Sequence, residues 1–130
     1  MIMHLAVTLL SSLFLFASFY PLDWAPLVWI ALVPLLFVCF KVSLVNAFKF
    51  GMLCGLAFWL LDISWIARVS YLGWICLSIY CAFFMGFFAM SAAFLARRYV
   101  IRSTTGNPML LFIIPAIWVG FEFVRSRLFS

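Results

Sequence analysis

The sequence predicts an all-α integral membrane protein: one domain, residues 1–130, built as a bundle of about five transmembrane helices. Composition is the first reason. The chain is 70% hydrophobic and only 8% charged, with a mean hydropathy of +1.32, whereas soluble domains average roughly 45–50% apolar and about 25% charged residues. The second reason is that apolar runs repeatedly approach the roughly 20 residues that a helix needs to cross a bilayer. The runs are too long for the strands of a membrane β-barrel.

The apolar runs define the predicted spans, at about 2–20, 25–40, 50–67, 74–96 and 109–124. The first run has no Lys or Arg before it and no clear small-residue cleavage site after it, which favours a span over a secretory signal peptide. The second follows the tight turn "PLDWAP" and contains Pro34. Because proline removes an internal helix hydrogen bond, Pro34 predicts a kink.

The remaining spans are separated by polar connections. We expect the segment 41–49, "KVSLVNAFK", to link the second span to the third. The segment 97–108, "RRYVIRSTTGNP", is the clearest loop, and its Asn-Pro pair marks a stop and a restart. The fifth span carries Pro115 and ends near Val124.

The net charge of +5 comes from basic residues at the ends of apolar runs. One side of the predicted bundle receives Lys41, Lys49, Arg97, Arg98 and Arg102, and the other receives Arg68, Arg125 and Arg127. The positive-inside rule makes the first side cytoplasmic, which places the N-terminus in the cytoplasm of a multi-pass protein. No basic face is interleaved with aromatic residues, so we expect no nucleic-acid partner.

The chain lacks the residue sets that carry covalent or metal chemistry. Its cysteines all lie in apolar runs, at Cys39, Cys54, Cys76 and Cys81, and its single histidine is His4. Buried cysteine behaves as a small hydrophobe. There is no Ser-His-Asp set, P-loop or Gly-rich dinucleotide motif. We therefore predict no catalytic residue, no cofactor and no metal in this chain.

Three ionisable residues at membrane depth are the candidates for function. Asp62 lies within the third span, where a charge costs roughly 2.5–3.5 kcal/mol on insertion scales. It either serves a function or is stabilised by water or by a hydrogen bond from another helix. Glu122 and Arg125, three residues apart, share a helix face. They either form an interfacial ion pair, with Arg127 reaching lipid phosphates, or hold an anionic headgroup.

Gly51 and Gly55 form a GxxxG motif in "GMLCG". Small residues at this spacing allow two helix backbones to approach closely. The motif serves packing either inside the chain or between two chains, and the number of predicted helices favours packing inside the chain.

Three stretches in order resemble the N-terminal membrane part of the apolipoprotein N-acyltransferase family: "FYPLDWAPLVWIALVPLLF", "FKFGMLCGLAFWLLDISWIARVS" and "PAIWVGFEFVRSRLFS". The matching positions are Pro21, Asp23, Trp24, Pro26, Gly51, Gly55, Trp65, Ser70, Pro115, Ala116, Trp118, Glu122 and Arg125. The resemblance covers nearly the whole chain. It adds Trp65 to Asp62, Glu122 and Arg125 as candidates to line a lipid path.

The resemblance implies a location and a reaction. Members of the family lie in the bacterial cytoplasmic membrane and transfer an acyl chain from a phospholipid to the N-terminal diacylglyceryl-cysteine of a lipoprotein. The family's active-site cysteine belongs to a nitrilase-like domain with a Glu-Lys-Cys triad. No cysteine here matches that nucleophile, and the sequence stops where the family's outward loop is expected. We therefore expect a truncated chain that is inactive alone.

Two other interpretations remain open. In the first, a separately encoded catalytic domain is the partner of this chain. In the second, the chain is a small polytopic membrane protein of another class, such as a transporter subunit or an assembly factor. Asp62, Glu122 and Arg125 would then line a polar path between helices.

Overall fold

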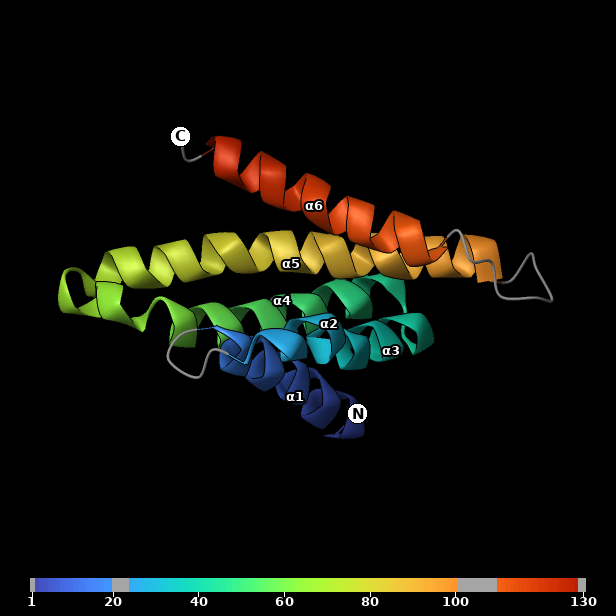
Figure 1. Cartoon of the computed structure of the whole chain (residues 1–130), viewed down its shortest axis with the longest axis horizontal. Coiled ribbons are helices and arrows are strands. Elements are labelled where there is room, and N and C mark those ends of the chain that lie inside the picture. Colours follow the sequence, from blue (N-terminus) through green and yellow to red (C-terminus); the bar gives the residue numbers. More distant parts are fainter. Residues whose placement is uncertain (1, 20–23, 101–109, 129–130) are drawn as a thin grey trace.

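The structure is a computed structural model that describes residues 2–19, 24–100 and 110–128, and all of the regular structure in these ranges is helical (Figure 1). The elements are α1 (Ile2–Ser18), the 3-10 turn η1 (Ala25–Leu27), α2 (Val28–Ala31), α3 (Val33–Lys41), α4 (Leu44–Asp62), the 3-10 turn η2 (Ser64–Arg68), α5 (Tyr71–Val100) and α6 (Leu110–Leu128). The predicted all-helical class is confirmed, with α2 and α3 as the two halves of one broken helix. Pro21, Asp23 and residues 101–108 of the predicted loop lie outside the described ranges.

Two of the described helices are long and apolar enough to cross a membrane, namely Leu44–Asp62 and the Tyr71–Arg98 part of α5. The apolar helix α1 is shorter, at 17 residues. Length and composition therefore suggest a membrane location.

The break between α2 and α3 falls where Pro34 predicts a kink. Pro34 has no backbone N–H to donate to the carbonyl of Ile30, four residues earlier. That carbonyl instead accepts from the backbone N–H of Leu32, the residue that separates the two helices. Pro34 then occupies the first turn of α3, where proline is well tolerated.

The boundaries of α4 differ from the predicted third span, 50–67. The helix begins at Leu44, inside the expected link, because the side chain of Ser43 caps it by accepting from the backbone N–H of Asn46 at 3.3 Å. It ends at Asp62, and residues 64–68 form η2. Asp62 is therefore the last residue of its helix. Hydropathy could not locate either end, because a capping residue sets one and a tight turn the other.

The core of the bundle is the contact between α4 and α5, which lie side by side (Figure 1). Gly51 and Gly55 are buried in this contact. A Cβ on Gly51 would lie 2.4 Å from the Cβ of Ala89, and one on Gly55 would lie 2.8 Å from the Cβ of Met85. Both glycines of the GxxxG motif thus face α5 of the same chain.

Helix α1 packs against α4 and the broken helix through a stripe of buried hydroxyl groups. Thr8 and Ser18 donate to carbonyls one turn back, those of His4 and Phe14, both at 2.7 Å. Ser11 instead donates across the interface to the carbonyl of Ala31. These bonds satisfy the hydroxyl groups within an apolar environment, where an unpaired polar group is costly.

Candidate functional site

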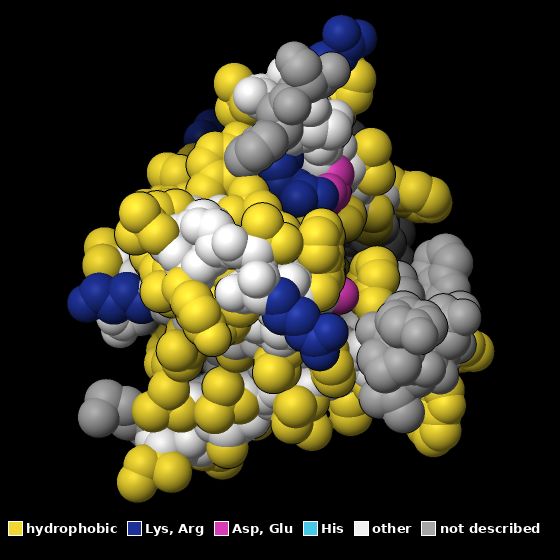
Figure 2. All heavy atoms as spheres, turned by 90° about the vertical axis from the view of Figure 1, so that its left-hand side faces the viewer, with side chains coloured by type: hydrophobic (Ala, Val, Ile, Leu, Met, Phe, Trp, Pro, Cys, Tyr) yellow, Lys and Arg dark blue, Asp and Glu magenta, His cyan; other side chains and the backbone are white. Residues whose placement is uncertain are grey.

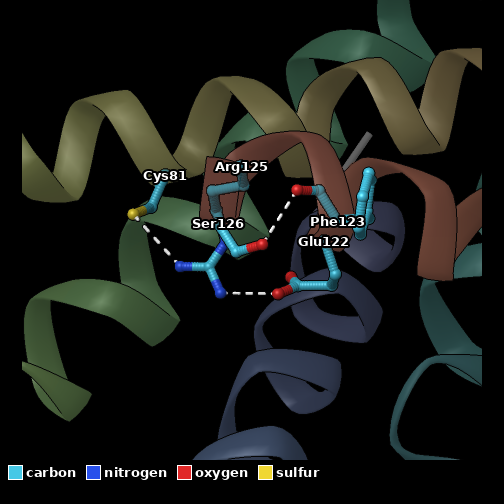
Figure 3. Close-up of polar contacts among 5 residues, drawn as sticks. All are labelled: Cys81, Glu122, Phe123, Arg125 and Ser126. Carbon is cyan, nitrogen blue, oxygen red and sulfur yellow. Dashed lines mark hydrogen bonds and ion pairs between the residues drawn. The ribbon is translucent and has the colours of Figure 1, made fainter. Parts of the chain in front are cut away.

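The candidate site begins with an ion pair on α6. Glu122 and Arg125 lie one turn apart, and an Arg125 guanidinium nitrogen donates to a Glu122 carboxylate oxygen at 2.5 Å (Figure 3). The side chain of Arg125 is 26% exposed and that of Glu122 is 36% exposed. This partial burial distinguishes the pair from a freely solvated surface salt bridge, because burial reduces screening by water and salt.

Arg125 also connects α6 to the two central helices. A second guanidinium nitrogen lies 3.7 Å from the Cys81 Sγ on α5 (Figure 3). The guanidinium carbon lies 4.8 Å from the ring centroid of Trp59 on α4, within the range of a cation–π contact. The remaining nitrogen, Nε, is buried and has no hydrogen-bond partner among the described residues. Each terminal guanidinium nitrogen carries a second N–H, so the partly exposed group can donate to a further molecule.

These residues line a cavity of about 320 Å³ among α1, α4, α5 and α6. We call it the aromatic cavity; its lining consists of Leu15, Phe19, Leu32, Phe58, Trp59, Asp62, Cys81, Phe84, Met85, Trp118, Phe121, Glu122 and Arg125. On α4 and on α6 the lining residue nearest the C-terminus is charged, Asp62 and Arg125 respectively. The two helix C-termini lie at the same end of the bundle (Figure 1). The cavity is therefore apolar along its length and charged at one end.

The structure brings three of the four candidate residues together. Asp62, Glu122 and Arg125 all line the aromatic cavity, although the side chain of Asp62 forms no hydrogen bond or ion pair with any described residue. Trp65 lies on η2, is 65% exposed and does not line the cavity. Gly51 and Gly55 do not line the cavity and lie in the α4–α5 contact.

Sequence reasoning missed Trp59 and Cys81 as members of the site. Trp59 precedes Asp62 by three residues, so helical spacing alone places the two side chains on one face of α4. That signal was present in the sequence. Cys81 had no such signal, because its proximity to Arg125 arises only when α6 packs against α5.

The chemistry that this arrangement supports is the binding of an amphiphilic molecule. Aromatic and aliphatic walls favour a hydrocarbon chain, while one guanidinium and two carboxylates can orient a polar group. The described residues contain no cluster of three His, Cys, Asp or Glu side chains of the kind that binds a metal. The site therefore has the features of a binding site for a lipid-like molecule.

The fold and this site define a class: an apolar helical bundle with a charged cluster at one end of an aromatic cavity. Residues 11–130 match the family described as "Apolipoprotein N-acyltransferase N-terminal domain", and the chain belongs to that family. The resemblance inferred from the sequence motifs is thereby confirmed.

A curated relative gives the scale of the match. The apolipoprotein N-acyltransferase of Geobacter metallireducens is 32% identical over 127 residues, an alignment that covers 94% of this chain and 24% of that protein. The chain thus spans about a quarter of the length of this relative. No solved structure matches the chain.

Proposed function

We propose that this chain is the N-terminal membrane part of an apolipoprotein N-acyltransferase, and that its aromatic cavity holds the phospholipid from which an acyl chain is taken. The proposal places the chain in the bacterial cytoplasmic membrane, with five spans and a cytoplasmic N-terminus. Membership of the family supports it, and so do the apolar helices. Figure 2 adds that the end of the bundle bearing the charged cluster is largely hydrophobic at its surface.

The exposed apolar side chains are the next support. Val69, Leu72 and Phe112 are 83%, 75% and 78% exposed, and many other large hydrophobic residues are also exposed. Exposed apolar surface of this extent marks an interaction surface, because water solvates it poorly. Lipid tails are the environment that fits these residues in a chain with so few charges.

The single observation that carries the lipid-binding role is the shape and polarity of the aromatic cavity. A hydrocarbon chain between Phe84, Met85 and Trp118 would leave its headgroup near Arg125. The guanidinium of Arg125, whose side chain is 26% exposed, can donate to a phosphate oxygen. Asp62, which has no partner among the described residues, is an acceptor available to an amine.

We place bond-making elsewhere in the enzyme. About three quarters of the Geobacter metallireducens protein lies outside the match, since the alignment covers 24% of it. The catalytic residues that transfer the acyl chain to a lipoprotein would belong to that remainder, or to a separately encoded partner. Purified alone, this chain is expected to form no acyl thioester and to acylate no lipoprotein peptide.

A photoreactive phospholipid tests the proposed role. The chain is placed in nanodiscs that contain phosphatidylethanolamine with a photoreactive group near the end of one acyl chain, and crosslinked peptides are mapped by mass spectrometry. We expect crosslinks in the α5 and α6 segments that line the aromatic cavity. Arg125→Gln should lower their yield severalfold, whereas Arg127→Gln, which removes the same charge from an exposed side chain on the same helix, should not.

Crosslinks spread evenly over the outer faces of the helices would contradict the binding role of the cavity. Equal losses in the two arginine variants would show that only charge near the membrane surface matters. A transport role, the alternative class, is tested separately by Asp62→Asn, which should abolish solute movement if Asp62 lies on a polar path. In a phospholipid-binding site it should alter only lipid capture.

A further inference from the structure

A second cavity lies near the other end of α4. It has a volume of about 620 Å³ and is formed by α1, α4 and Val42, which lies between α3 and α4. We call it the basic groove; its lining consists of His4, Leu5, Val42, Asn46, Lys49, Phe50 and Leu53. It shares no lining residue with the aromatic cavity.

The basic groove combines apolar walls with cationic and hydrogen-bonding groups. Leu5, Phe50 and Leu53 supply hydrocarbon surface, and the Phe50 ring lies 6.2 Å from the His4 ring, centroid to centroid, in an edge-on arrangement. Lys49 supplies an ammonium group and Asn46 an amide. The lining is therefore amphiphilic, as in the aromatic cavity, but its fixed charge is positive.

No described carboxylate balances this charge. Of the three acidic residues in the chain, Asp62 and Glu122 line the aromatic cavity, and Asp23 is outside the described ranges. A second cation lies at the edge of the groove, where Arg97 donates to the carbonyl of Val42 at 2.6 Å. Within the described part of the chain, the positive charge of this end has no carboxylate partner.

We propose that the basic groove is a second lipid site, which binds an anionic membrane phospholipid with its phosphate against Lys49 and Asn46. The acyl chain then lies along Leu5, Phe50 and Leu53. This inference rests on the bilayer location given under the proposed function, but not on acyl transfer. A free phosphate ion does not account for the apolar walls, whereas a phospholipid uses both parts of the lining.

The test uses native mass spectrometry of the full chain in detergent micelles that contain equal amounts of phosphatidylglycerol and phosphatidylcholine with identical acyl chains. We expect bound phosphatidylglycerol to exceed phosphatidylcholine severalfold. Lys49→Gln should reduce that preference by about fivefold, the factor that corresponds to the attraction of one basic residue to an anionic membrane surface. Lys49→Arg should retain it, because the charge is kept.

Arg98→Gln is the matched control, since it removes the same charge from an exposed residue near the same end of the bundle that does not line the groove. Equal losses in the Lys49 and Arg98 variants would overturn the proposal, as would equal retention of the two lipids by the unmodified chain. Leu53→Trp narrows the apolar part without changing charge and should also weaken retention. Added inorganic phosphate should not displace the lipid.

The outcome is separable from that of the crosslinking test. Lys49→Gln is not expected to change crosslinking in the aromatic cavity, and Arg125→Gln is not expected to change phosphatidylglycerol retention. If both variants altered both measurements, the two cavities would be one continuous lipid surface and the second site would be rejected.

Discussion

The α4–α5 contact and the α5–α6 contact pack two helices together with side chains of different size. Between α4 and α5, glycine and alanine residues let the backbones lie so close that Cβ atoms on Gly51 or Gly55 would overlap α5. Helix α6 runs at an angle to α5 (Figure 1), and none of its described side chains is fully buried. Large side chains hold it: the Trp118 ring lies 4.9 Å from that of Phe88, centroid to centroid, and the Phe121 ring lies 6.5 Å from that of Phe84.

The two contacts differ in how closely the helices approach. We call the α4–α5 contact, with Gly51 and Gly55, the frame, and helix α6 with its large side chains the wall. Close contact of small residues gains dispersion over a long interface and tolerates no added volume. Large side chains keep helices apart and leave space between their points of contact. The aromatic cavity occupies such a space, so we expect the site to depend on the contact that is weaker and more easily rearranged.

The largest predicted effect is at the frame. Gly51→Leu forces a side chain into Ala89 and into the carbonyl of Met85, which lies 2.8 Å from the position of the added Cβ. We expect the free energy of unfolding to fall by about 3 kcal/mol, the upper part of the usual range for overpacking. Unfolding in mixed micelles with increasing dodecyl sulfate, followed by tryptophan fluorescence, measures it.

Gly120→Leu on α6 is the matched control. Apart from its two chain neighbours and the nearby backbone of α6, a Cβ at Gly120 would meet no atom of the described residues within 4 Å, and leucine has the higher helix propensity. We expect no loss of stability, and a small gain is consistent with the comparison. Similar losses at Gly51 and Gly120 would break the comparison, since α6 would then be as tightly packed as the frame.

Sequence reasoning succeeded for several features that contiguous stretches of sequence determine. Hydropathy predicts the helices because lipid-length apolar runs have few alternatives. The position of Pro34 predicts the break that follows Ala31, and spacing predicts the pairing of Glu122 with Arg125. The break and the ion pair each depend on residues within about one helical turn, and the helices depend on longer apolar runs of contiguous sequence.

Features that need three-dimensional packing were not predictable in the same way. Asp62 lines the same cavity as the Glu122–Arg125 pair because of where α4 ends and how α6 lies across α5. The family resemblance adds Trp65 to Asp62 as a candidate, but the helix ends between them and η2 leaves Trp65 exposed. A motif shared with a family identifies residues without stating which cavity they line.

The next prediction concerns the wall alone. Trp118→Leu removes the edge-on contact with Phe88, and such pairs contribute about 0.5–1.5 kcal/mol beyond buried area. We expect amide hydrogen exchange in α6 to accelerate roughly tenfold while exchange in α4 and α5 stays unchanged. Phe123→Leu, at a residue that is 58% exposed on the same helix, should leave exchange unaltered. Faster exchange in all three helices would make α6 part of the frame.

The smallest predicted effect is the coupling between Glu122 and Arg125 on α6. A double-mutant cycle of Glu122→Gln and Arg125→Gln should give a coupling free energy of about 0.5–1 kcal/mol, near the upper limit for exposed pairs, because both side chains are partly buried. The same cycle with Arg127, five positions from Glu122 and off its helix face, should give a value near zero. A coupling of zero for Arg125 as well would mean that water screens the pair fully. Trp59 on α4 and Cys81 on α5 would then position the Arg125 guanidinium for the headgroup, and Glu122 on α6 would not.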